Sequence, residues 1–165
     1  MKIISFDKFN RNLDLEPIKF SLTQRDDGAG WSLAKVELLE VWYRRFLYLA
    51  NLYPDKVIVP SNDIDKFWHT HILDTQKYVA DCKNLFGKYF HHFPYFGMRG
   101  EKDRSNLEGA FQETEKLYLE HFGESPLSSG IADCGALCNE PTPKLKRYNL
   151  YGNERPTLTR VEIIN

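Results

Sequence analysis

The sequence has little of several features that mark particular classes of protein. It contains only three cysteines, an odd number that does not suggest a secreted, disulfide-bonded scaffold. The net charge is −1, so the basic excess of a typical nucleic-acid-binding domain is missing. No apolar run approaches the roughly 20 residues of a transmembrane helix, and the first residues lack the apolar segment of a signal peptide. We therefore expect a cytoplasmic protein without a membrane or nucleic-acid partner.

What the sequence does contain is typical of one globular domain. Its 165 residues are 42% hydrophobic and 27% charged. A chain of this length buries roughly 68–70% of its unfolded surface, so it needs neither disulfides nor a metal merely to fold. Aromatic residues make up 14% of the chain, and such rings supply large buried areas and shaped cavities.

The spacing of apolar residues predicts an all-α fold, a compact bundle of about four main helices. One or two short helical pieces are expected over 6–20. A longer helix should begin after Ser32, as N-cap, and end at Pro54. A helix over about 62–86 should end at Gly87, and a last one over about 104–122 should end at Gly123.

The chain changes character near Pro126, which divides it into two predicted parts. Residues 1–125 form a helical metal-binding domain, and residues 126–165 form an irregular extension that is packed on it or mobile. The extension contains Cys134 and Cys138, four residues apart. Three roles remain open for these thiols: weaker candidate metal ligands, a redox disulfide, or free small residues.

The histidines give the clearest indication of chemistry. Four of the five lie between residues 69 and 92, as the pairs His69 and His71, and His91 and His92. Neutral imidazole is the commonest metal-ligand side chain, and zinc, iron and copper all accept it. We therefore predict that these four histidines bind a transition metal ion of one of these three kinds. A hydrogen-bonded network of histidines is the structural alternative.

Helix geometry leaves two arrangements open for the first pair. Residues two apart on a helix point about 200° away from each other, so His69 and His71 do not reach one metal without a local distortion. In one arrangement His71, on the apolar stripe, meets His91 or His92. In the other, Asp65 and His69, four residues apart, form the pair and a loop histidine completes it. The first arrangement is favoured, because His71 shares its helix face with apolar residues and a polar ring among apolar neighbours needs a partner.

Other polar residues receive weaker assignments. Tyr78, Tyr95 and Asp65 are candidate catalytic groups, the tyrosines as proton donors, although the aromatic residues of this region are first of all expected to line the core and a cavity. Asp74 or Asp81 is expected to orient a histidine through its second nitrogen. Cys82 is expected to be buried and inert, and His121 to be structural.

The same region resembles a known family. The run Pro60-Ser61, Ile64-Asp65, Trp68-His69-Thr70-His71, Tyr78, Asp81-Cys82, Phe86-Gly87 and His91-His92 is similar to the glycine-rich domain-containing protein-like family. The resemblance covers roughly residues 15–122, and its specific part is the Trp-His-Thr-His run with a downstream histidine. It implies a helical domain and specifies no reaction. The glycine-rich region of the larger family members is absent here.

Three functions are compatible with these residues. The first is a small redox or hydrolytic metalloenzyme, in which two or three imidazoles and Asp65 leave open positions on the metal of an aromatic-lined site. The second is a non-catalytic interaction module with a structural metal or a histidine network. The third is a metal carrier that uses Cys134 and Cys138. A small molecule or a peptide is the expected partner.

Overall fold

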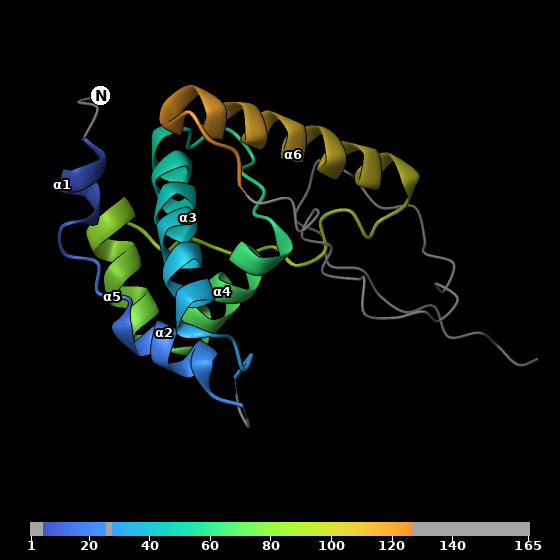
Figure 1. The fold of residues 1–165 in the computed structure, drawn as a ribbon. Helices are drawn as coiled ribbons and strands as arrows, with labels where there is room; N and C mark the ends of the chain where they lie inside the picture. The colour runs from blue at the N-terminus through green and yellow to red at the C-terminus, as the bar shows by residue number, and fades with distance from the viewer. Residues whose placement is uncertain (1–4, 26–27, 127–165) are drawn as a thin grey trace, which may run out of the picture.

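The computed structural model describes residues 5–25 and 28–126, and these residues form an all-α fold without strands (Figure 1). The prediction of an all-α protein is therefore confirmed. Six helices follow one another along the chain: α1 (Phe6–Asn10), α2 (Glu16–Thr23), α3 (Leu33–Leu52), α4 (Asn62–Leu73), α5 (Thr75–Phe86) and α6 (Glu101–Phe122).

Helix α3 is the centre of the domain. It contacts α1, α2, α4 and α6, while α4 also packs against α2 and α5. In Figure 1, α6 lies across one end of α3. The core between these helices is rich in aromatic rings, as the composition predicts; its largest fully buried side chains include Tyr43, Phe46, Phe67, Tyr78 and Tyr118. The helices are thus stabilised mainly by burial of large rings.

Several helix ends lie where the sequence places them. The side chain of Ser32 accepts a hydrogen bond from the Lys35 backbone N–H at 3.3 Å, as an N-cap does. Helices α5 and α6 end at Gly87 and Gly123, which have φ of 69° and 70°. Glycine adopts this left-handed conformation without the steric cost of a Cβ.

The prediction of one helix over 62–86 is wrong, because the helix is interrupted at Asp74. Asp74 has φ −79° and ψ 73°, and its side chain accepts a hydrogen bond from the Lys77 backbone N–H as the N-cap of α5. An aspartate side chain competes in this way with continued helix formation. The break turns a polar face of α5 partly inward: Val79 is 53% exposed, whereas Tyr78 and Asp81 are buried.

Two further expectations can be compared with the structure only within the described residues. The predicted extension over 126–165, with Cys134 and Cys138, lies almost entirely outside them, so the division into two parts stays a prediction. Within residues 5–25 and 28–126, no helix is both long enough and apolar enough to cross a membrane.

Candidate metal site

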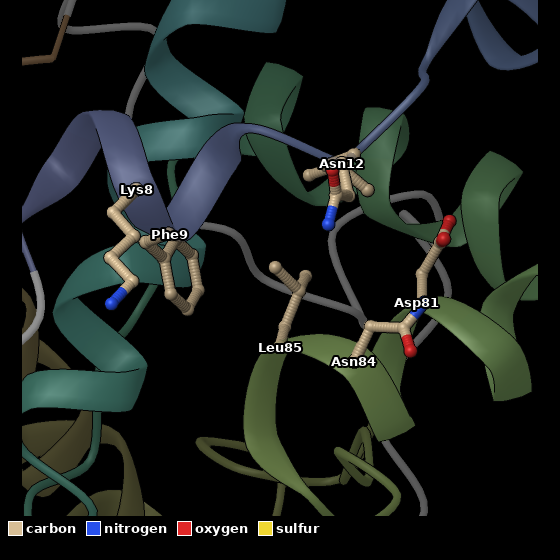
Figure 2. Close-up of a pocket in the computed structure, with 7 residues that line it drawn as sticks. Lys8, Phe9, Asn12, Asp81, Asn84 and Leu85 are labelled. Carbon is tan, nitrogen blue, oxygen red and sulfur yellow. The ribbon is translucent and has the colours of Figure 1, made fainter.

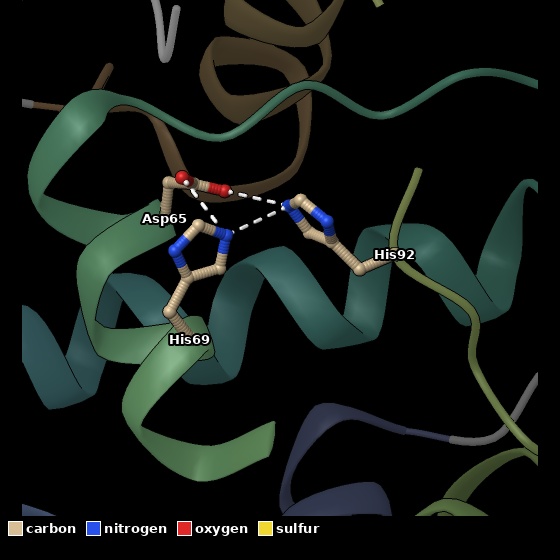
Figure 3. A group of neighbouring side chains, drawn as sticks. All are labelled: Asp65, His69 and His92. Atoms are coloured by element: carbon tan, nitrogen blue, oxygen red, sulfur yellow. Dashed lines mark hydrogen bonds and ion pairs between the residues drawn. The ribbon is translucent and has the colours of Figure 1, made fainter. Parts of the chain in front are cut away.

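Three side chains from two parts of the chain converge at one point (Figure 3). Asp65 and His69 lie one turn apart on α4, and His92 comes from the loop between α5 and α6. His92 Nε2 lies 3.0 Å from His69 Nε2 and 3.2 Å from Asp65 Oδ1. His69 Nε2 lies 3.4 Å from Asp65 Oδ2. We call this group the Asp–His–His triad.

The first two members share a face because of helix geometry. Residues four apart in an α-helix lie on the same side, and α4 is regular from Asn62 to Leu73. The carboxylate of Asp65 is held with only 12% of its side chain exposed. Its position in the first turn of α4 favours negative charge, because the helix N-terminus carries partial positive charge.

The third member is positioned by aromatic contacts from α4 and α5. The Trp68 ring stacks on the Phe90 ring and makes a T-shaped contact with the His92 ring, at centroid distances of 4.9 and 4.6 Å. Trp68 Nε1 donates a hydrogen bond to Tyr78 Oη at 2.8 Å, and the Tyr78 hydroxyl donates to the Phe90 carbonyl oxygen at 2.6 Å. The backbone two residues before His92 is thereby fixed against the helix that carries Asp65 and His69.

The far end of the same loop is anchored by a fully buried carboxylate. Asp103, in the first turn of α6, accepts hydrogen bonds from the backbone N–H groups of Gly97 and Arg99 at 2.8 and 3.2 Å. Its second oxygen accepts from Arg99 Nη2 at 2.9 Å. The loop that carries His92 is therefore held at both ends by hydrogen bonds to helices.

The geometry of the triad suits a cation. With metal–ligand bonds of about 2.0–2.2 Å, neighbouring ligand atoms of a tetrahedral or octahedral ion lie roughly 2.9–3.5 Å apart. Here the two Nε2 atoms are 3.0 Å apart, His92 Nε2 is 3.2 Å from Asp65 Oδ1, and His69 Nε2 is 3.4 Å from the other oxygen, Oδ2. Two Nε2 atoms 3.0 Å apart cannot both carry a proton toward each other without repulsion. One of them therefore presents its lone pair, and a central ion would take a lone pair from each of the two nitrogens and from Asp65.

Burial keeps His69 in the form that binds metals. Desolvation lowers the pKa of His69, and His92 lowers it further, while the carboxylate of Asp65 acts in the opposite direction. A lowered pKa means that the neutral imidazole, whose free lone pair ligates metals, prevails at neutral pH. The His69 side chain is nevertheless 45% exposed, against 12% for His92. The triad thus meets solvent on the His69 side.

His71 lies elsewhere, in a buried network of its own. Its side chain is 1% exposed; Nε2 lies 3.0 Å from Asp81 Oδ2, and Nδ1 lies 2.9 Å from Tyr43 Oη. Since Asp81 only accepts, His71 Nε2 donates to it and Nδ1 accepts from the Tyr43 hydroxyl. Both ring nitrogens therefore have protein partners, so this geometry does not support the favoured arrangement with His71 as the inward ligand. Asp81 thus contacts a histidine, as expected, but one that lies outside the triad, whereas Asp74 caps α5.

The remaining candidates also lie outside the triad. His91 is exposed and its ring contacts Tyr89 at 4.7 Å. Tyr78 uses its hydroxyl to hold the loop, and burial raises its pKa. The ring of Tyr95 packs against Phe93. Further polar candidates behave as structural groups: Cys82 is buried, and His121 Nε2 lies 2.7 Å from Tyr53 Oη. The structure thus joins two of the four histidines with the more weakly predicted Asp65.

A separate pocket of about 90 Å³ lies between α5, α1 and the segment after α1 (Figure 2). It is lined by Lys8, Phe9, Asn12, Leu13, Asp81, Asn84 and Leu85. Phe9 is the single aromatic residue among them, and no member of the triad lines it. This pocket is therefore not the aromatic-lined cavity expected beside the histidines; the aromatic residues of that region fill the space around His92 instead.

The sequence does not reveal that Trp68 and Tyr78 hold His92: it predicts both as core or cavity wall, and Tyr78 also as a candidate proton donor. Their burial was predictable, but their partners were not. The available signal is chemical: a buried indole N–H and a buried phenol each need a hydrogen-bond partner. Such partners are often backbone carbonyl groups of nearby loops, here that of Phe90.

The fold and the site together define the chain as a small helical domain with a histidine–carboxylate triad. Residues 17–114 match the UCP032817-like family, so the chain belongs to that family. All three triad residues fall within the matched segment.

Two curated relatives confirm the resemblance to glycine-rich domain-containing proteins. Glycine-rich domain-containing protein 1 of Arabidopsis thaliana is 33% identical over 97 residues, which is 56% of this chain and 12% of the relative. Glycine-rich domain-containing protein 2 of the same plant is 32% identical over 108 residues, or 61% of this chain and 13% of the relative. The chain thus spans only a small part of the length of these relatives. No solved structure matches it.

Proposed function

We propose that this domain binds one transition metal ion through Asp65, His69 and His92. The observation that carries the proposal is the convergence of one carboxylate oxygen pair and two imidazole nitrogens at separations of 3.0–3.4 Å. These are borderline and hard donors, which suit zinc, iron(II) and copper(II). A Cu(I) carrier would prefer thiolates, and the triad contains none.

We further propose that the site is catalytic, in a redox or hydrolytic reaction. Catalytic zinc sites keep three protein ligands and one open position, and two histidines with one carboxylate are also the ligand set of many iron(II) oxygenases. A bound ion would supply Lewis acidity or electron transfer to a substrate. The protein's part is to hold the three donor atoms, with the Trp68 ring excluding water from one side of His92.

Metal content tests the first part of the proposal. The full chain is purified without an affinity histidine tag, loaded with zinc, iron(II) or copper(II), desalted and analysed by mass spectrometry. We expect one ion per chain in the wild type and in His91→Ala, and a loss of the ion in His92→Ala. His91 is the matched control, because it is the neighbouring histidine and lies outside the triad. Equal metal content in both variants would contradict the proposal.

A non-catalytic interaction module is the second candidate, and one observation favours it. The triad atoms already lie within hydrogen-bonding or ion-pair distance of one another, so they can hold the loop to α4 without an ion. In that case a chelator leaves the free energy of unfolding unchanged. If a metal is bound, its removal lowers the free energy of unfolding by mass action, so the chelator distinguishes a metal site from a metal-free histidine network.

A further inference from the structure

The triad leaves one side of a bound ion uncovered. His69 Nε2 and His92 Nε2 lie 3.0 Å apart, and each lies next to a different oxygen of Asp65: His92 next to Oδ1 at 3.2 Å and His69 next to Oδ2 at 3.4 Å. An ion bonded to both nitrogens and to the carboxylate would have all its protein ligands on one side. Its remaining coordination positions therefore point away from Asp65, His69 and His92.

The exposed fractions of the three side chains indicate on which side the free coordination positions face solvent. The side chains of Asp65 and His92 are each 12% exposed, whereas that of His69 is 45% exposed. The rings of Trp68 and His92 make a T-shaped contact, with their centroids 4.6 Å apart, so Trp68 covers part of His92. Solvent and small molecules therefore approach the triad from the side of His69.

The net charge of the metal centre determines which kind of molecule binds at its free coordination positions. A divalent ion held by two neutral imidazoles and one carboxylate keeps a net positive charge. An anionic oxygen donor gains Coulomb energy at such a centre that a neutral molecule of the same shape does not.

An apolar side chain lies beside the same opening. Leu73 is the last residue of α4 and follows His69 by four positions, so the two share a helix face. Leu73 is 80% exposed, the most exposed large hydrophobic side chain among the described residues. The apolar part of a small ligand on the metal can bury some of this surface.

We propose that the open positions of the metal take a small carboxylate whose aliphatic chain contacts Leu73. This inference rests on the proposed metal site and names the class of its ligand or substrate. The observations that carry it are the convergence of the two imidazole nitrogens and the Asp65 carboxylate, the exposure of His69 and the exposed Leu73 on the same helix face.

The test uses the full chain loaded with Co(II), because the visible absorption of Co(II) reports both its binding and any change of its ligands. The loaded protein is titrated with acetate, butyrate and neutral acetamide. We expect saturable spectral changes with both acids and none with acetamide. Each added methylene should tighten binding by up to about fourfold, from the free energy of burying a CH₂ group.

Two serine variants locate the aliphatic contact. Leu73→Ser should remove the preference for butyrate over acetate, while Leu119→Ser, which changes an exposed leucine on α6, should keep it. Co(II) that binds but does not respond to either acid would overturn the inference and leave the metal site intact. Co(II) that does not bind would overturn both. A preference for butyrate that survives in Leu73→Ser would overturn the assigned contact.

Discussion

His92 Nε2 lies 3.0 Å from His69 Nε2, although 23 positions separate the two residues in the sequence. The contact joins the loop between α5 and α6 to the exposed face of α4. Because the Asp65 carboxylate lies within 3.4 Å of both imidazoles, the three groups form a unit. Changes to any residue that positions His92 should therefore weaken metal binding at the proposed site.

Tyr78→Phe should weaken metal binding without touching a ligand. The substitution removes the hydroxyl that links Trp68 Nε1 to the Phe90 carbonyl oxygen. We expect metal affinity to fall about tenfold or more, as for other groups that orient ligands. Two buried polar groups lose their partner, so the free energy of unfolding should fall by about 1–3 kcal/mol.

Metal titration and urea denaturation measure these two effects separately. Tyr53→Phe is the control, because the Tyr53 hydroxyl contacts His121 at 2.7 Å in an exposed position. That variant should keep the metal affinity of the wild type. Unchanged affinity in Tyr78→Phe would show that the hydroxyl does not position His92.

Asp103→Asn should be among the most destabilising single substitutions in the loop region. Asp103 is fully buried and pairs with the buried Arg99. Removing one partner of a buried ion pair costs about 3–5 kcal/mol. Glu108→Gln, on the same helix, removes a partner of the exposed Arg104 and should cost less than about 1 kcal/mol. Thermal and urea unfolding of both variants compare them, and similar costs would refute the anchoring role of Asp103.

The free energy of unfolding should decrease as the pH falls below about 6.5, the ordinary value for histidine. Burial lowers the pKa of His71 in the folded protein, although Asp81 acts in the opposite direction. The unfolded chain then binds more protons than the folded chain between the folded pKa and 6.5. The stability that this group contributes is present above that window and is lost as the pH falls through it, with a slope of up to about 1.4 kcal/mol per pH unit.

Urea denaturation of the metal-free protein at a series of pH values measures this slope. His71→Gln should reduce the slope, whereas His91→Ala, which changes an exposed histidine, should retain it. Should the slope survive in His71→Gln, another group would be responsible for the pH dependence.

The sequence predicts those features that local geometry decides. Ser32, Gly87 and Gly123 end their helices because capping and left-handed backbone conformation depend on neighbouring residues alone. The pairing of Asp65 with His69 follows from a four-residue spacing on one helix, and the sequence analysis included it as one of two arrangements.

The choices that depend on distant contacts were not predictable in the same way. The interruption at Asp74 was not predicted because an apolar periodicity continues across it, although the Asp74 side chain caps α5 locally. His71 is satisfied by Tyr43, which is 28 positions away. The selection of His92 over His91 depends on the path of an irregular loop, which the stacking of Phe90 on Trp68 fixes.

Location of a bound metal in a crystal tests the central claim most directly. Crystals of the full chain grown with zinc are measured at the zinc absorption edge, where anomalous scattering identifies the ion. We predict one peak within about 2.0–2.2 Å of His69 Nε2, His92 Nε2 and an oxygen of Asp65. A peak beside His71 or His91 instead, or no peak near α4 at saturating zinc, would contradict the assignment of the triad as a metal site.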